Sequence, residues 1–153
     1  MTKTGIERAV IFWLEDRRIV VEIALSVIVL AAYVAIPIPR TGTAFFCISG
    51  LLLAGFYFIG AFFRPDFENI FTLICIKVAG IASASCLVGI ILAIEGLHGA
   101  QISLMTGLAL LPATIYLFFD YLKSPRKETI LLVLRGLIIS ALSFYFFNHA
   151  FIK

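Results

Sequence analysis

The sequence predicts an all-α, polytopic integral membrane protein with five transmembrane helices and a short N-terminal interfacial amphipathic helix. Hydrophobic residues make up 62% of the chain and charged residues 14%, whereas a soluble domain is nearer half apolar and a quarter charged. The apolar residues fall in runs of about 20, the length that a helix needs to cross about 30 Å of hydrocarbon. A chain of 153 residues has no room to bury so much apolar surface, so we expect the bilayer to serve as its solvent.

Five apolar runs define the expected spans. The short segments between them contain prolines or glycines, which favour turns: Pro37, Pro39, Pro65, Gly96, Gly99 and Pro125. Because each connection is short, consecutive helices are expected to be antiparallel neighbours. We therefore divide the chain into an N-terminal cytoplasmic segment, 1–18, and a transmembrane bundle, 19–153, with spans at 19–36, 43–63, 70–94, 102–122 and 129–147.

The segment before the first span has the pattern of an amphipathic helix over residues 4–18. Ile6, Val10, Trp13 and Leu14 follow the i, i+4, i+7, i+8 spacing of one helical face. Such a segment would lie in the cytoplasmic interface, with its tryptophan at headgroup depth. A helical extension of the first span fits the same pattern.

The distribution of Lys and Arg predicts a cytoplasmic N-terminus. Short loops on the cytoplasmic side carry an excess of these residues. One expected side holds only Arg40 and Lys153. The other side holds eight basic residues: Lys3, Arg8, Arg17, Arg18, Arg64, Lys123, Arg126 and Lys127.

Aromatic residues such as Phe56, Tyr57 and Phe58 cluster near helix ends, as interfacial anchors do.

Four charged residues form an expected intramembrane cluster in the cytoplasmic leaflet. Glu22, Lys77 and Arg135 lie inside apolar runs, and Asp120 lies at the cytoplasmic end of the fourth span. Lys77 and Arg135 would lie roughly 9–10 Å below the boundary, at about 1.5 Å per residue. A lone charge at mid-bilayer costs about 2.5–3.5 kcal/mol, so pairing is expected. The cluster fits a relay or a site for an anionic headgroup, and it equally fits structural ion pairs or snorkelling.

Small residues in the third span predict a helix-packing face. Gly80, Ser83, Ala84 and Gly89 would let another helix approach closely, and Gly80 and Ala84 have small-xxx-small spacing. The sequence leaves open whether this contact lies within the chain or with a partner. In the fourth span, Pro112 is expected to kink the helix, because proline cannot donate the helical hydrogen bond.

No pattern in the sequence predicts an enzyme, a metal site or a cofactor. His98 and His149 fall on the outer side, but a metal site needs three or four ligands. Walker A, HExxH, GxSxG and CxxC patterns do not occur. The basic residues are dispersed at helix ends, which excludes a nucleic-acid-binding patch.

Residues 89–108 read GIILAIEGLHGAQISLMTGL. A glycine-containing helix, a turn ending in Gly99-Ala100 and a second helix with Gly107 resemble the membrane hairpin of the gliding-motility and type 9 secretion motor protein GldL and its small relatives in Bacteroidetes. The resemblance implies a bacterial inner-membrane hairpin that packs with other helices. The second helix lacks a carboxylate beyond Gly107, where the motor protein carries one, so a motor role does not carry over.

These observations predict a non-enzymatic inner-membrane protein that contacts membrane lipids. We expect it to be a subunit that assembles with itself or with other membrane proteins. The alternative is a small transporter or lipid-binding protein that uses the inner-leaflet charged residues.

Overall fold

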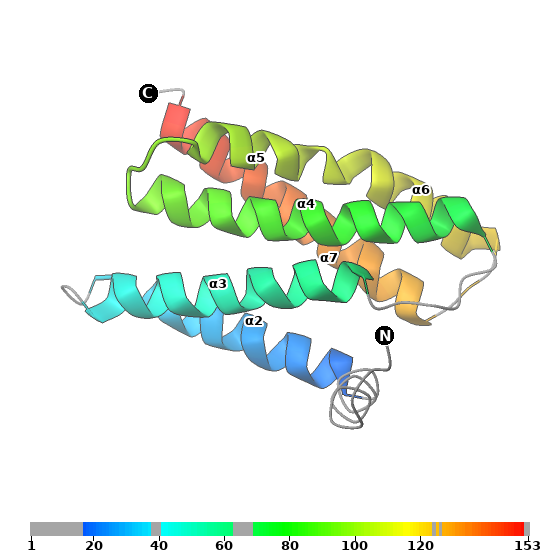
Figure 1. The fold of residues 1–153 in the computed structure, drawn as a ribbon, viewed down its shortest axis with the longest axis horizontal. Helices are drawn as coiled ribbons and strands as arrows, with labels where there is room; N and C mark the ends of the chain where they lie inside the picture. The colour runs from blue at the N-terminus through cyan, green and yellow to red at the C-terminus, as the bar shows by residue number, and fades with distance from the viewer. Residues whose placement is uncertain (1–16, 38–40, 63–68, 124, 126, 152–153) are drawn as a thin grey trace, which may run out of the picture. The chain divides into compact units, whose positions relative to one another are not determined.

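The computed structural model describes residues 17–37, 41–62, 69–123, 125 and 127–151. Within these ranges the chain forms helices joined by turns and short connections, without a strand, so the all-α prediction is confirmed. The expected amphipathic helix over 4–18 lies almost entirely outside the described residues. The helices (Figure 1) are α2 (Arg18–Val34), α3 (Thr41–Phe62), α4 (Ile70–Ile94), α5 (Ala100–Leu108), α6 (Leu110–Lys123) and α7 (Lys127–Phe151).

Four of these segments are long and apolar enough to cross a membrane, by length and composition. They are Thr41–Phe62, Ile70–Ile94, Ala100–Lys123, in which α5 and α6 together form one span, and Thr129–His149. Helix α2 has 17 residues and is not among them. It ends at Val34 rather than at 36, because a residue that precedes proline, as Ile36 precedes Pro37, is disfavoured in the helical conformation.

The chain divides into two compact units, Met1–Ser49 and Gly50–Lys153. In the first unit, α2 and the beginning of α3 form an antiparallel helical hairpin. The rings of Tyr33 and Phe46 meet edge to face, with centroids 5.9 Å apart. Nearer the turn, a Cβ atom on Gly42 would overlap the carbonyl oxygen of Ala35, so glycine allows the two backbones to touch there.

In the second unit, α4 packs against each of the other helical segments. Its start and end match the predicted third span, because the residues at both ends favour the beginning and the end of a helix. The side chain of Asn69 caps the first turn by accepting a hydrogen bond from the backbone N–H of Phe71 at 3.0 Å. Gly96 follows the last turn with φ +64°, a conformation in which a helix commonly ends on glycine.

The span that follows is interrupted at Ala109, between α5 and α6. Proline removes a backbone donor and collides with the carbonyl four residues earlier. For Pro112 that carbonyl belongs to Leu108, the last residue of α5. The predicted kink therefore takes the form of a break one residue after Leu108.

Small and polar residues fill the centre of the second unit, where α4, α5 and α7 meet. A Cβ atom on Gly107 would lie 2.8 Å from both the Cβ of Cys86 and the Oγ of Ser143. The Ser143 hydroxyl donates a hydrogen bond to the carbonyl of Leu104 at 2.8 Å. The Cys86 thiol donates to the carbonyl of Ile139 at 3.7 Å. These contacts fix the register of the three helices.

Candidate functional site

Arg135 on α7 is the most deeply placed charged side chain among the described residues. It is 8% exposed, although α7 is otherwise apolar around it. Its guanidinium carbon lies 4.5 Å from the centre of the Tyr57 ring on α3, and Tyr57 itself is 4% exposed. A cation over an aromatic face is attracted by the ring quadrupole, and the attraction is strongest where water is excluded. The Tyr57 ring therefore helps to stabilise the positive charge that Arg135 places inside the bundle.

Tyr57 also marks the closest approach of α3 and α4. A Cβ atom on Gly80 would lie 3.0 Å from the Tyr57 carbonyl oxygen and 2.6 Å from the Cβ of Ala61. Further along the same contact, a Cβ atom on Gly50 would lie 2.9 Å from the side chain of Ile91. The two contacts belong to one antiparallel register. Gly50 lies eleven residues before Ala61 on α3, and Ile91 lies eleven residues after Gly80 on α4.

Lys77 lies beside this contact. It is half-buried and stands three residues before Gly80, so the two positions are about 60° apart around α4. Among the residues that the structure describes, none forms a hydrogen bond or ion pair with the Lys77 ammonium group. Arg135 and Lys77 therefore both border the α3–α4 contact, from α7 and from α4 respectively.

Asp120 is placed near Cys75 of α4. Its carboxylate, half-buried on α6, lies close enough to the Cys75 thiol to act on it electrostatically. Cys75 and Lys77 are two residues apart on α4, which places them about 200° apart around the helix axis. The fourth predicted member, Glu22, is half-buried on α2 in the first unit.

The predicted packing residues are all buried, but they serve more than one contact. Gly80 meets α3, whereas a Cβ atom on Gly89 would lie 2.9 Å from the backbone nitrogen of Leu104 on α5. Nine residues separate the two glycines, which corresponds to about half a turn around α4. Ser83 donates a hydrogen bond to the carbonyl of Ala79 at 2.6 Å, and Ala84 is 7% exposed. The small residues therefore let α4 contact a helix on each side.

Tyr57 is the residue of this site that sequence reasoning missed, because it was grouped with the aromatic residues of the interface. A helical spacing distinguishes it from its neighbours. Ala54, Tyr57 and Ala61 lie at i, i+3 and i+7 and are all buried, whereas Phe58 is 49% exposed. A tyrosine between two alanines on one helical face indicates packing against another helix rather than anchoring at the interface.

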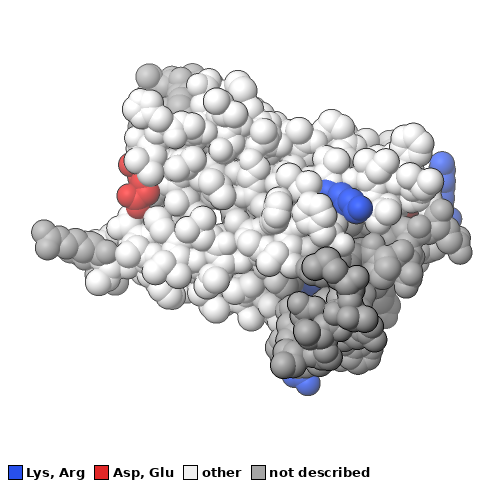
Figure 2. Space-filling model, in the orientation of Figure 1, with Lys and Arg blue, Asp and Glu red and all other residues white. Residues whose placement is uncertain are grey.

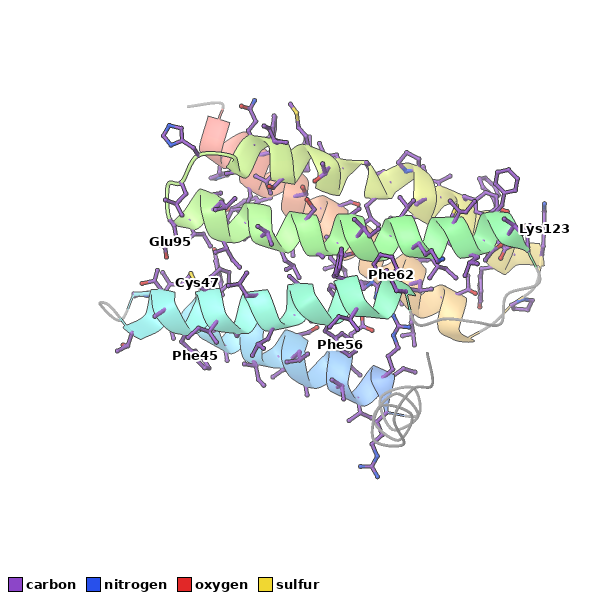
Figure 3. The ribbon with its side chains drawn as sticks, in the orientation of Figure 1. Phe45, Cys47, Phe56, Phe62, Glu95 and Lys123 are labelled. Carbon is purple, nitrogen blue, oxygen red and sulfur yellow. The ribbon has the colours of Figure 1, made fainter. Side chains whose placement is uncertain are left out.

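The remaining charges of the second unit gather at its ends. Figure 3 labels Glu95 at the end of α4 that leads to α5, and Lys123 at the opposite end of the unit. Figure 2 shows an uncharged face over α4 and α5 between these ends, interrupted by basic atoms over α4. No group of three or more metal-ligating side chains occurs in the part of the chain that the structure describes.

No family model, curated protein or solved structure matches the chain.

Proposed function

We propose that this chain is a non-enzymatic, multi-pass protein of a bacterial inner (cytoplasmic) membrane, with five spans and a cytoplasmic N-terminus. In this proposal it acts as a subunit that assembles with itself or with other membrane proteins. The eight-to-two distribution of Lys and Arg supports the orientation. Helix α2 supplies the fifth span, since 17 residues lie at the lower limit of the lengths that cross a bilayer.

The connections support an activity that takes place in the membrane. The segments that connect consecutive spans are short in sequence: residues 35–40, 63–69, 95–99 and 124–126. None of these connections is long enough to form a domain of its own. The helical surface is therefore where this part of the chain meets its partners.

A hydroxyl pair on that surface is the observation that favours assembly. The hydroxyls of Ser85 on α4 and Thr106 on α5 lie 2.5 Å apart, with Ser85 half-buried and Thr106 exposed. Thr106 donates to the carbonyl of Ser103 at 2.7 Å, so its oxygen accepts the proton of Ser85 and keeps one lone pair. In lipid that lone pair finds a donor only on another helix, and such interhelical hydrogen bonds contribute about 0.6 kcal/mol on average.

We expect native mass spectrometry of the detergent-extracted protein to show a homo-oligomer or a complex with another membrane protein. Replacing Ser85→Ala together with Thr106→Val should shift the population toward the single chain, because the partner loses its hydrogen-bond acceptor. Ile81→Val with Ile102→Val is the matched control, since both side chains are exposed on the same two helices. A wild-type protein that is a single chain without a partner would refute the assembly role.

The alternative function, a small transporter or lipid-binding protein, has one specific observation in its favour. Lys77 precedes Gly80 by three residues on α4, and Arg135 lies over the Tyr57 ring on α3, the helix that Gly80 contacts. Charged residues inside spans commonly mark a pathway or a ligand site.

A further inference from the structure

The break between α5 and α6 leaves backbone groups without their helical partners. Helix α5 ends at Leu108 and α6 begins at Leu110 (Figure 1). Because Pro112 has no N–H, the carbonyl of Leu108 lacks the hydrogen bond that residue 112 would donate in a continuous helix. In a span, a carbonyl that is freed in this way needs another donor, on a neighbouring helix, a side chain or an ordered water molecule.

Two contacts of α7 place Ser140 at the level of this break. The Ser143 hydroxyl donates a hydrogen bond to the carbonyl of Leu104 on α5 at 2.8 Å. Seven residues earlier on α7, a Cβ atom on Gly136 would overlap the hydroxyl of Thr114 on α6. Ser140 lies about midway between these two positions of α7, and the break lies midway between Leu104 and Thr114 on the opposing span.

The face of α7 that makes both contacts also carries Ser140. Gly136, Ser140 and Ser143 follow the i, i+4, i+7 spacing, so the three positions lie within about 60° of one another around the helix axis. Ser140 is 3% exposed, and its hydroxyl has no hydrogen-bond partner among the described residues. By contrast, the buried hydroxyl of Ser83 donates to the carbonyl of Ala79, four residues earlier on its own helix. Ser140 therefore presents an unpaired hydroxyl to the break.

A buried hydroxyl and a freed carbonyl at the same level favour a water molecule between them. A buried water typically makes two to four hydrogen bonds, to polar groups that are otherwise unpaired. The Ser140 hydroxyl can donate or accept, whereas the Leu108 carbonyl can only accept. The first N–H groups of α6 need acceptors, because a helix leaves these donors without partners of its own. Water can satisfy all of these groups, since it both donates and accepts.

We infer that the α5–α6 break is a binding site for a water molecule, which is held between the Ser140 hydroxyl and the Leu108 carbonyl. The site lies near the middle of the candidate span Ala100–Lys123. Leu110, the first residue of α6, is 0% exposed, so the site is separated from bulk solvent. The water gives the broken span a hydrogen-bonded connection to α7. This site goes beyond the assembly role and does not depend on it.

X-ray radiolytic labelling of the full-length chain in detergent tests the site, because hydroxyl radicals formed from a bound water oxidise the side chains beside it. Leu110 and Leu117 are both 0% exposed on α6, about two turns apart. We expect peptide mass spectrometry to show that Leu110 is oxidised several-fold faster than Leu117. Ser140→Ala should abolish this difference, whereas Ser83→Ala, the matched control, should preserve it because the Ser83 hydroxyl is already paired within α4.

Thermal unfolding provides a second readout, whose sign separates a water site from an unpaired hydroxyl. If water is bound, Ser140→Ala removes one of its hydrogen bonds and should lower the melting temperature by about 2–4 °C. If no water is bound, alanine removes a buried polar group that lacks a partner, and the melting temperature should rise.

Three outcomes would overturn the inference. One is a wild type in which Leu110 is oxidised as slowly as Leu117, a result that requires no variant to fold. Another is a melting temperature that is higher for Ser140→Ala than for the wild type. The third is sodium chloride, compared with choline chloride at the same concentration, raising the melting temperature of the wild type but not of Ser140→Ala. That result would assign the site to a cation.

Discussion

Replacing Gly89 by leucine should lower the melting temperature of the purified protein by several degrees. A Cβ atom there would lie 2.9 Å from the Leu104 nitrogen and 3.0 Å from the carbonyl carbon of Ser103. These are backbone atoms of α5, so the neighbour cannot rotate away and the helices must separate. Overpacking of this kind costs about 1–3 kcal/mol, which corresponds to roughly 2–12 °C in melting temperature for a chain of this size.

Gly80→Leu should have an effect of similar size, since a Cβ atom there would lie 2.6 Å from the Cβ of Ala61 and 3.0 Å from the Tyr57 carbonyl oxygen, and neither atom can rotate away. Gly55→Leu is the matched control on α3, because a Cβ atom there would meet nothing within 4 Å. Thermal unfolding followed by circular dichroism in detergent measures all three variants. Equal melting temperatures for Gly89→Leu and Gly55→Leu would contradict the packing described for α4.

Arg135→Gln and Tyr57→Leu should show strong coupling in a double-mutant cycle. Each substitution removes the same cation–π contact, so the second should cost less in the presence of the first. A buried contact of this type contributes about 2 kcal/mol, and we expect a coupling free energy of about 1–2 kcal/mol. The free energy of unfolding is measured by denaturant titration of the four proteins in detergent.

Tyr145 provides the control for this cycle. It lies on α7, as Arg135 does, but it is 50% exposed and stacks on His149, with ring centroids 4.3 Å apart. Arg135→Gln and Tyr145→Leu should therefore be additive. A coupling with Tyr57 no larger than that with Tyr145 would show that Arg135 is held by other contacts.

The elements were most predictable where local chemistry determines their ends. The bounds of α4 follow from a capping asparagine, Asn69, and a glycine, Gly96, with positive φ. The end of α2 was placed two residues too late, because the apolar run continues to Ile36 although Pro37 already disfavours the helix. Proline also determined where α5 and α6 separate, but the sequence alone did not show that the kink would be a break.

The candidate site was less predictable, because hydropathy locates a charge along a helix but does not identify its neighbours. Lys77 and Asp120 were expected in one cluster, and their pairing stays a prediction. The small residues were read as one face, whereas Gly80 and Gly89 contact different helices. Tertiary packing decides these points. The pairing of Glu22 with a basic residue stays a prediction.

The five-span arrangement is tested most directly by reporter fusions at Thr2 and Lys153. Four segments meet the length and composition needed to cross a membrane, and α2 is the helix that decides whether the number of spans is odd. A fluorescent protein that folds only in the cytoplasm and a phosphatase that is active only outside it give opposite signals. We predict a cytoplasmic N-terminus and a C-terminus on the other side. Both ends in the same compartment would contradict five spans.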